Sequence, residues 1–424
     1  MAKTLTPDID AKRLYGSIRE LGKVGAYRDE RTGLMGVNRL ALTSADREGR
    51  RLVVKWFKQA GLKVRVDRVG NVYGRREGLE PGLRPVMAGS HIDSVPTAGA
   101  FDGCLGVLGA LEVVRALNAR KIATRRPLVA AFFTDEEGCR FGVDMLGSAV
   151  ATGRIRLEDA YALKDQAGLS VKEELGKIGF LGSDPVRAML PHAYAECHIE
   201  QGPILKRTGM ELGVVSGVQA ISWFEALITG KSCHAGTTPM EYRSDAGVAA
   251  SKLNLKLREW TASGLFGKDF RATMGVFRPH PGMVNVVPGR LACSVDLRNP
   301  SDSMMRRAEK ALFTYAKRVE KEEGVSIAWR RTAGTPAVRF DPSVQALIDE
   351  TAGGMGLRRR SILSGAGHDA QEWSRLCKTA MIFVPGEYDG ISHNPREFST
   401  PKQCADGVRC LLRVILALCE ERGR

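Results

Sequence analysis

The chain has 424 residues, of which 43% are hydrophobic, so it can form two or three domains with large buried cores. It carries 63 Lys and Arg against 48 Asp and Glu, a formal net charge of +15, but the basic residues are scattered and only 6% of the residues are aromatic. A nucleic-acid-binding protein normally shows a basic patch, stripe or motif, which argues against that class here. Nine cysteines without a C-x-x-C pair argue against a disulfide framework and against a thiolate zinc site.

The two ends of the chain give no sign of a membrane protein. Residues 1–20 are too polar for a signal peptide. The apolar stretch 410–419 contains Arg413 and is far shorter than the roughly 20 residues needed to cross a bilayer, so we expect a packed terminal helix. Together with the unpaired cysteines, this predicts a cytoplasmic protein with no membrane partner.

A strand and a helix flank the first candidate site residues. Residues 85–88 form a short apolar run typical of a buried parallel strand. Residues 105–120 have helical length and apolar residues on most sides, which predicts a buried crossover helix. His91 and Asp102 lie between the two, so we expect both in a strand-to-helix loop.

Three further apolar runs lead into acidic or histidine residues. The runs are 128–133 before Glu136 and Glu137, 193–197 before His198, and 379–384 before His393. Ligands of open α/β sheets bind beyond the carboxyl ends of the strands. We therefore predict an α/β fold in which four strand ends meet at one site.

The residue types suit a pair of divalent cations. Imidazole and carboxylate groups together bind Zn²⁺, our first expectation, or neighbouring ions such as Mn²⁺, Co²⁺ or Ni²⁺. Two such ions usually share a carboxylate, and Asp102 is the candidate bridge. Asp93, two residues after His91, can hold the second nitrogen of that imidazole. Of Glu136 and Glu137, one can bind a metal while the other takes a proton from water.

Each of these residues also has an ordinary alternative role. A lone His or Glu at a strand end is usually a solvated loop residue, and a buried Asp is often a helix cap. The joint pattern is less ordinary, because the chain has only seven His and three of them lie in these segments.

The motifs together resemble a known family. In chain order they are GSHIDSVP, FDG, TDEEGCRF, CHIEQGP, HAGTTPM, NVVPG, SGAGHDA and GISHNP. Over about residues 15–420 they resemble the M20 metallopeptidase-like superfamily. Within it they are similar to the hydantoinase/carbamoylase branch, which contains N-carbamoyl-L-amino acid hydrolases, β-ureidopropionase and allantoate amidohydrolase. Two departures, a missing Gly-Gly pair before FDG and one extra residue before GISH, border the expected cleft and concern the substrate more than catalysis.

This resemblance implies two metal sites and a general base. The implied ligands are His91, Asp102 and His198 for one ion, and Asp102, Glu137 and His393 for the other. Glu136 would be the general base. His198 follows the carbamoylase branch, because peptidase members typically have a carboxylate at its position.

The resemblance also implies how substrate is held. His234 would come from the smaller domain, often that of the partner subunit in a homodimer, and would polarise the scissile carbonyl. Gln201, Asn285 and Arg298 match positions that hold the ureido group and the carboxylate of the substrate. The alternative for His234 and Arg298 is a surface position on a dimerisation domain.

The chain order of these segments predicts two domains. Residues 1–212 and 332–424 form a discontinuous catalytic domain with a mixed, largely parallel sheet flanked by helices. Residues 213–331 alternate like half-exposed strands, and Asp245 is expected to cap a helix that runs to about Trp260. This segment is predicted to be an inserted α+β lid and dimerisation domain.

The expected function is metal-dependent hydrolysis of an N-carbamoyl amino acid to the amino acid, CO₂ and ammonia. Hydrolysis of allantoate and an exopeptidase with the same metals are the alternatives within the family. A non-catalytic binding protein on this fold would normally have lost a metal ligand or the base, and all six residues are present.

Overall fold

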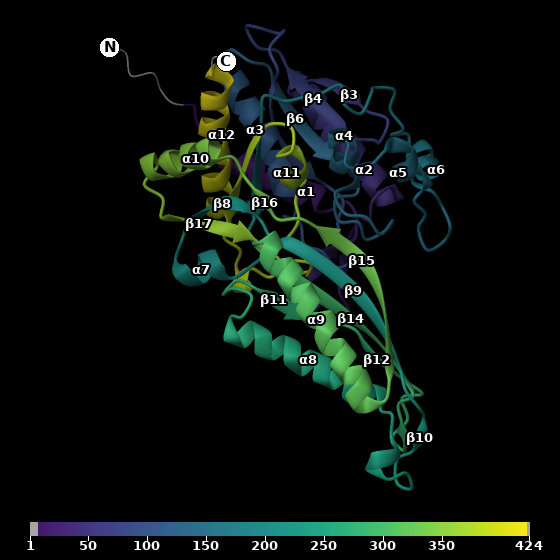
Figure 1. Cartoon of the computed structure of the whole chain (residues 1–424). Helices are drawn as coiled ribbons and strands as arrows, with labels where there is room; N and C mark the ends of the chain where they lie inside the picture. The colour runs from purple at the N-terminus through teal and green to yellow at the C-terminus, as the bar shows by residue number, and fades with distance from the viewer. Residues whose placement is uncertain (1–6, 422–424) are drawn as a thin grey trace. The chain divides into compact units, whose positions relative to one another are not determined.

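The chain is described here as a computed structural model that covers residues 7–421 (Figure 1). Residues 1–6, which belong to the segment predicted not to be a signal peptide, lie outside this range. The chain divides into two compact units, residues 1–217 with 339–424 and residues 218–338. Within residues 7–421, no helix is both long enough and apolar enough to span a bilayer.

A mixed sheet of nine described strands forms the centre of the first unit. Its order is β16-β8-β18-β7-β5-β6-β4-β3, with β17 beside β8. The strands are β3 (Lys63–Val66), β4 (Val72–Arg76), β5 (Val86–His91), β6 (Leu128–Phe133), β7 (Ala193–Ile199), β8 (Leu212–Val218), β16 (Val338–Arg339), β17 (Arg359–Ser364) and β18 (Lys378–Val384). The neighbours β18, β7, β5 and β6 run parallel, whereas β8, β4 and β3 pair antiparallel. The predicted mixed sheet is confirmed, and its four neighbouring strands β18, β7, β5 and β6 are parallel.

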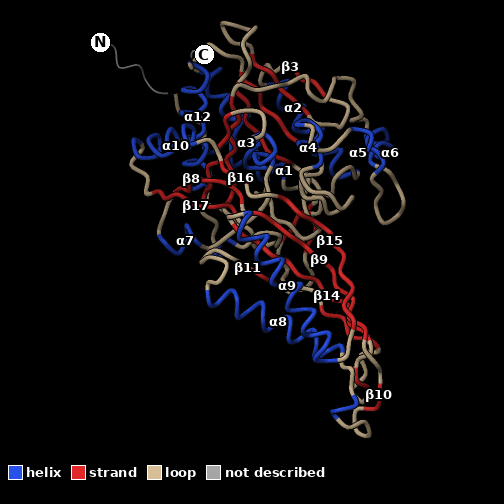
Figure 2. The backbone as a smooth tube through the Cα atoms, in the orientation of Figure 1, coloured by secondary structure: helices blue, strands red, loops and turns tan. Residues whose placement is uncertain are grey.

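Helices pack around this sheet (Figure 2). They are α1 (Ala11–Leu21), α2 (Ser44–Gln59), α3 (Cys104–Ala119), α4 (Leu146–Thr152), α5 (Leu157–Ala162), α6 (Val171–Ile178), α7 (Ile204–Thr208), α10 (Pro342–Gly354), α11 (Asp369–Trp373) and α12 (Pro401–Glu420). A two-stranded sheet, β1 (Ala26–Arg28) with β2 (Met35–Val37), and a short 3₁₀ turn, η2 (Tyr388–Gly390), complete the unit. The predicted C-terminal helix is α12, which packs against α3, β7 and β18.

The helix α3 lies very close to the sheet. A Cβ atom on Gly106 would come within 2.8 Å of the Ser90 Cβ and 2.9 Å of the Cys197 carbonyl oxygen. Almost every residue of α3 is buried, as its apolar sequence predicts. This close packing fixes the start of α3, and therefore Asp102 just before it, against β5 and β7.

Two of the expected positions differ from the structure. His91 is the last residue of β5 rather than a loop residue, and His198 lies within β7 rather than after it. The reason is that strand pairing depends on the backbone: His91 pairs with Phe133 and His198 pairs with Phe383 in parallel ladders. In both strands the backbone pairing continues past the end of the apolar run, into a histidine that belongs to the candidate site.

The second unit is an antiparallel sheet with two long helices on one face. The strands β9 (Ala220–Thr229), β11 (Arg271–Thr273), β12 (Phe277–His280), β14 (Arg290–Asn299) and β15 (Ser326–Thr335) form the sheet, and the helices are α8 (Ala246–Ser263) and α9 (Asp302–Glu323). A separate two-stranded sheet, β10 (Cys233–His234) with β13 (Val286–Val287), and the turn η1 (Met240–Tyr242) belong to the same unit. As predicted, the Asp245 side chain caps α8, by accepting from the backbone N–H groups of Gly247 and Val248.

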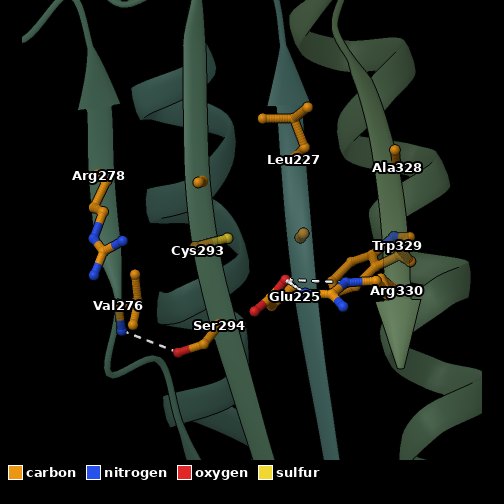
Figure 3. Close-up of a pocket in the computed structure, with 11 residues that line it drawn as sticks. Glu225, Leu227, Val276, Arg278, Cys293, Ser294, Ala328, Trp329 and Arg330 are labelled. Carbon is orange, nitrogen blue, oxygen red and sulfur yellow. Dashed lines mark hydrogen bonds and ion pairs between the residues drawn. The ribbon is translucent and has the colours of Figure 1, made fainter. Parts of the chain in front are cut away.

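The two faces of this sheet differ in exposure, because α8 and α9 cover only one of them. Along β9, buried Phe224 alternates with exposed Trp223 and Leu227, which face away from α8 and α9. Figure 3 shows the uncovered face, where a hollow of 430 Å³ contains the ion pair between Glu225 and Arg330. None of the predicted site residues lines this hollow.

Candidate metal centre

The parallel arrangement of the central strands brings the predicted ligands of the first unit together. Because β5, β6, β7 and β18 are parallel, their carboxyl ends lie at one edge of the sheet. His91 and His198 come from the ends of β5 and β7, Glu136 and Glu137 follow β6, and His393 follows β18.

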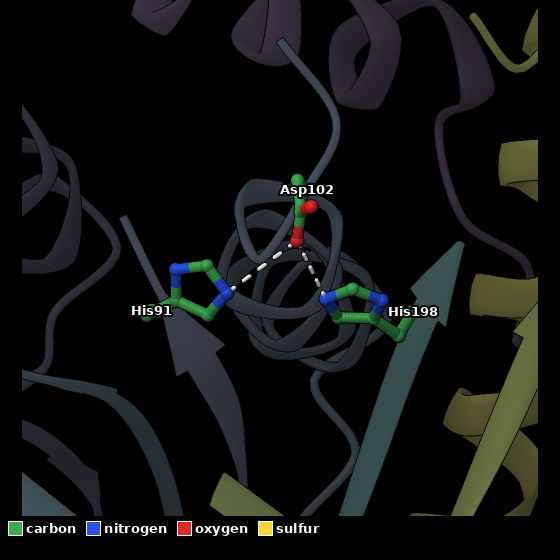
Figure 4. A group of neighbouring side chains, drawn as sticks. All are labelled: His91, Asp102 and His198. Carbon is green, nitrogen blue, oxygen red and sulfur yellow. Dashed lines mark ion pairs between the residues drawn. The ribbon is translucent and has the colours of Figure 1, made fainter. Parts of the chain in front are cut away.

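Asp102 stands between the two buried histidines. Its Oδ1 atom lies 3.5 Å from His91 Nε2 and 3.2 Å from His198 Nε2 (Figure 4). All three side chains are buried. Ligand atoms of these residues lie close enough together to hold one metal ion.

The hydrogen bonds of the two rings indicate which nitrogen atoms carry protons. His91 Nδ1 lies 3.0 Å from the Asp93 carbonyl oxygen, and His198 Nδ1 lies 2.8 Å from the Ile199 carbonyl oxygen. A carbonyl only accepts, so each Nδ1 is assigned a proton, and each Nε2 is the nitrogen directed toward the Asp102 carboxylate. An imidazole whose Nδ1 is held by a carbonyl in this way presents its Nε2 to a metal ion. The donor set therefore fits a metal ion.

The other oxygen of Asp102 faces a second group. Its Oδ2 atom lies 3.5 Å from His393 Nε2, which in turn lies 3.3 Å from Glu137 Oε2. The Glu137 Oε1 atom is buried and has no hydrogen-bond partner. Asp102, Glu137 and His393 also have ligand atoms close enough to hold an ion. Two groups thus share Asp102 through its two different oxygens, which is the arrangement expected of a bridging carboxylate.

The carboxylate of a third group of this kind, unlike that of Asp102, is not shared between two groups. It contains Glu196, His198 and His368. Both oxygens of Glu196 already accept hydrogen bonds, from Ser90, from Tyr194 and from the backbone N–H of Ala370. We therefore do not assign an ion to it.

The carboxylates and imidazoles at the site shift one another's pKa values. Hydrogen bonding to Asp102 and Glu137 raises the pKa of His393 to about 10. Burial opposes the protonation of His91, but Glu136, Asp102 and Asp93 outweigh it and raise its pKa well above the ordinary value. These shifts arise because several carboxylates lie close to the imidazoles in one site, and these are the group types that bind divalent cations.

Glu136 is distinct from its neighbour Glu137. Its Oε2 atom lies 3.5 Å from His91 Nε2, and it belongs to none of the groups that could hold a metal. Burial raises the pKa of Glu136 well above its ordinary value, and Asp369, Glu137 and Asp102 contribute in the same direction, although His91 opposes them. A raised pKa beside the metal ligands is the property expected of a general base.

Asp93 lies at the second nitrogen of His91, as its spacing predicts, and its closest contact there is made by the backbone. Its carbonyl oxygen lies 3.0 Å from His91 Nδ1, whereas its carboxylate Oδ1 lies 4.0 Å from the same nitrogen. The carboxylate instead accepts from the backbone N–H groups of Glu136 at 3.4 Å and Glu137 at 3.3 Å. The residue therefore contacts both the imidazole and the turn that carries the two glutamates.

Gly103 is required by the geometry around His91. Its φ is +63°, and a Cβ atom there would lie 2.5 Å from the His91 ring. Its backbone N–H donates to His198 Nε2 at 3.0 Å. Only glycine combines this backbone conformation with such close contact.

Of the predicted substrate-binding residues, Gln201 contacts the candidate metal ligand Asp102. Its Nε2 atom donates to Asp102 Oδ2 at 2.6 Å, while its buried Oε1 atom has no partner. The backbone of Gln201 has a φ of +55°, which is uncommon for a residue other than glycine and is often found at functional sites.

The other three predicted substrate residues belong to the second unit and lie at two ends of it. His234 pairs with Val286, and the backbone N–H of Ala235 donates to the Asn285 carbonyl, so His234 and Asn285 are neighbours. Arg298 lies near the opposite end of β14, where it forms an ion pair with Asp296. Figure 1 shows β10 beyond the far ends of β9 and β14.

Two site residues were missed by sequence reasoning. The Ser392 hydroxyl lies 2.9 Å from Asp102 Oδ2, and Glu397 accepts from the backbone N–H groups of Phe101 and Asp102. Ser392 is part of the GISHNP motif, so its position next to His393 was a usable signal. Nothing in the pattern around Glu397 distinguishes it from a surface glutamate.

Comparison with known proteins confirms the resemblance. Residues 87–417 match the family described as peptidase family M20/M25/M40. The N-carbamoyl-L-amino-acid amidohydrolase of Rhizobium meliloti is 37% identical over 413 residues, which is 97% of each chain. The ureidoglycolate hydrolase of Arabidopsis thaliana is 33% identical over 413 residues, 95% of this chain and 85% of that protein.

A solved structure agrees with these relatives. The amidase of the hydantoinase/carbamoylase family from Burkholderia multivorans is similar with a TM-score of 0.91 and 40% identity, over 98% of this chain and 99% of that one. The fold of this chain agrees with this match. The chain therefore belongs to peptidase family M20/M25/M40 and, within it, to the hydantoinase/carbamoylase branch.

Proposed function

We propose that the chain is a metal-dependent amidohydrolase that cleaves the carbamoyl C–N bond of an N-carbamoyl amino acid. The observation that carries this proposal is the Asp102 carboxylate, whose two oxygens face two separate groups of metal-ligating side chains. Glu136 beside them supplies a buried carboxylate that is free for proton transfer. The name of the Rhizobium meliloti relative, an N-carbamoyl-L-amino-acid amidohydrolase, supports the same substrate class.

Two divalent ions, with Zn²⁺ the first choice and Mn²⁺, Co²⁺ or Ni²⁺ as alternatives, would activate a water molecule and polarise the ureido carbonyl when bound. Glu136 takes a proton from the attacking water and returns it to the leaving nitrogen as the C–N bond breaks. The carbamate so released decomposes to CO₂ and ammonia.

The remaining predicted residues hold the substrate in this proposal. Arg298 binds its carboxylate, since a guanidinium can donate two parallel hydrogen bonds to one. Gln201 and Asn285 bind the ureido group, and His234 stabilises charge on the carbonyl oxygen. We further propose that residues 213–331 act as a lid and that the protein is a homodimer.

A second candidate is a hydrolase of another ureido acid, allantoate or ureidoglycolate. The similarity to the Arabidopsis ureidoglycolate hydrolase over 95% of this chain favours it. Such substrates also carry a carboxylate beside a ureido group, so the same metal residues and Arg298 would serve them.

Activity measurements on a panel of substrates decide between these candidate functions. Ammonia release by the Zn²⁺- or Mn²⁺-loaded protein is measured with N-carbamoyl-L-α-amino acids, N-carbamoyl-β-alanine, allantoate and ureidoglycolate, and amine release is measured with a dipeptide. We expect turnover of an N-carbamoyl-L-α-amino acid and none of the dipeptide. Turnover of the dipeptide alone would return the protein to the peptidases of the family and refute the proposal.

A further inference from the structure

The two candidate metal groups are positioned by different kinds of structure. His91 and His198 lie in β5 and β7, whose backbones are fixed by parallel ladders in the buried sheet. His393 lies in no strand or helix, has a φ of +53°, and its side chain is 49% exposed. The second group therefore needs another means of holding His393 in register with Asp102.

Glu397 is placed to supply this connection. Its side chain is 5% exposed, and its Oε1 atom accepts from the backbone N–H groups of Phe101 at 2.9 Å and Asp102 at 3.1 Å. Its Oε2 atom lies 2.6 Å from the Ser392 hydroxyl, which also lies 2.9 Å from Asp102 Oδ2. One carboxylate thus contacts both the backbone of the bridging aspartate and the residue before His393.

Packing around Glu397 joins the same two segments. A Cβ atom on Gly99 would come within 2.4 Å of the Glu397 Cβ, so the loop before Asp102 lies directly against this side chain. The rings of Phe101 and Phe398 meet edge to face with centroids 5.8 Å apart. The Thr97 hydroxyl also donates to the His393 carbonyl oxygen at 3.2 Å.

We propose that Glu397, acting through Ser392, is a positioning residue that holds Asp102 and His393 in register for the ion shared by Asp102, Glu137 and His393. The inference rests on the metal part of the proposed function. Residues that orient metal ligands commonly change metal affinity about 10–100-fold when they are replaced. Because β5 and β7 fix the two buried histidines independently, the effect is expected mainly at the His393 group.

The test is calorimetric titration of the metal-free full-length protein with Zn²⁺ alone, and separately with Mn²⁺ alone. Wild type is expected to bind two ions per chain. Glu397→Ala is expected to weaken one of the two binding events about 10–100-fold and the other much less. Glu397→Gln keeps an oxygen that can accept from the Phe101 and Asp102 N–H groups, so it should recover most of the lost affinity, and Ser392→Ala should resemble Glu397→Ala.

Two further variants separate positioning from general stability. In a His393→Ala background, Glu397→Ala should cause no additional loss of ion affinity, because both changes affect the same group. Glu112→Gln is the matched control, since Glu112 is a fully buried carboxylate that accepts from the Asp10 N–H and from Arg13 but contacts no candidate ligand. This control should change the melting temperature without changing either ion affinity.

The outcomes distinguish the inference from the proposed function. If wild type binds two ions and both Glu397→Ala and Ser392→Ala bind them equally tightly, the positioning role is wrong and the proposed function stands. An equal weakening of both ions, which Glu397→Gln does not restore, would also overturn it. A wild-type protein that binds no Zn²⁺ or Mn²⁺ would overturn the proposed function and this inference together.

Discussion

The Glu136→Gln variant is expected to bind two ions per chain and to hydrolyse its ureido substrate about 10²–10⁴-fold more slowly than wild type. Glu136 belongs to none of the groups that could hold a metal, and its buried carboxylate lies 3.5 Å from His91. The amide has nearly the same shape but cannot take a proton from water. The loss should therefore fall on kcat, with little change in KM or in metal content.

Glu137 provides the matched control for this experiment. It is the next residue in the chain, but its Oε2 atom lies 3.3 Å from His393 and it belongs to the second metal group. Glu137→Gln should lower the affinity for one ion, and high metal concentration should restore part of its activity. Near-normal turnover by a fully loaded Glu136→Gln protein would show that Glu136 is not the general base.

Asp102→Asn should be the most damaging single change to metal content. Both groups use this carboxylate, one through Oδ1 and the other through Oδ2. Asparagine removes the negative charge and one of the two ligand oxygens, so one ion loses a ligand and the other keeps only a neutral oxygen in place of a carboxylate. We expect fewer than two ions per chain by elemental analysis, and a loss of activity of at least roughly 10³-fold.

Glu196→Gln tests whether this effect is specific to Asp102. Glu196 is also a buried carboxylate near His198, but its oxygens already accept from Ser90, Tyr194 and Ala370. Its replacement should leave two ions bound, at some cost in stability. If Asp102→Asn keeps both ions, or if Glu196→Gln loses one, the assignment of the shared carboxylate is incorrect.

The candidate site residues that follow buried strands could be predicted, because apolar runs in the sequence mark those strands. Leu128–Phe133 is the predicted run and also the observed strand β6, so the position of Glu136 and Glu137 beyond it followed directly. The apolar run 85–88 ends three residues before His91 and so predicts a loop position for it, although backbone pairing continues through His91. Side-chain polarity reports burial, whereas the end of a strand depends on its hydrogen bonds.

The contacts that hold the ligands could not be predicted in the same way. Glu397 contacts the Asp102 backbone although 295 residues separate them along the chain. The sequence alone does not show whether a glutamate side chain is buried. The carboxylate of Asp93 turned to the Glu136 and Glu137 backbone because that turn presents two N–H groups to it. Both results depend on tertiary geometry that spacing along the chain does not carry.

The antiparallel register of the second unit has a consequence for genetics. Arg290 pairs with Thr229 near the β10 end of the sheet, whereas Arg298 pairs with Ile221 at the other end. At about 3.3 Å per residue, the eight steps from Arg290 to Arg298 span roughly 26 Å, which is much longer than a small ureido acid. If His234 and Arg298 touch the same substrate molecule, they must come from two different chains.

Two inactive proteins would then complement each other. Co-expressed His234→Ala and Arg298→Ala chains would form mixed dimers in which one of the two sites has both side chains intact. With random pairing, the mixture should regain about a quarter of wild-type activity, although each variant alone is nearly inactive. A mixture no more active than either variant alone would mean that the two residues do not act in one site. Complementation between two inactive variants thus reports how the chains are arranged in the assembly, without a structure of that assembly.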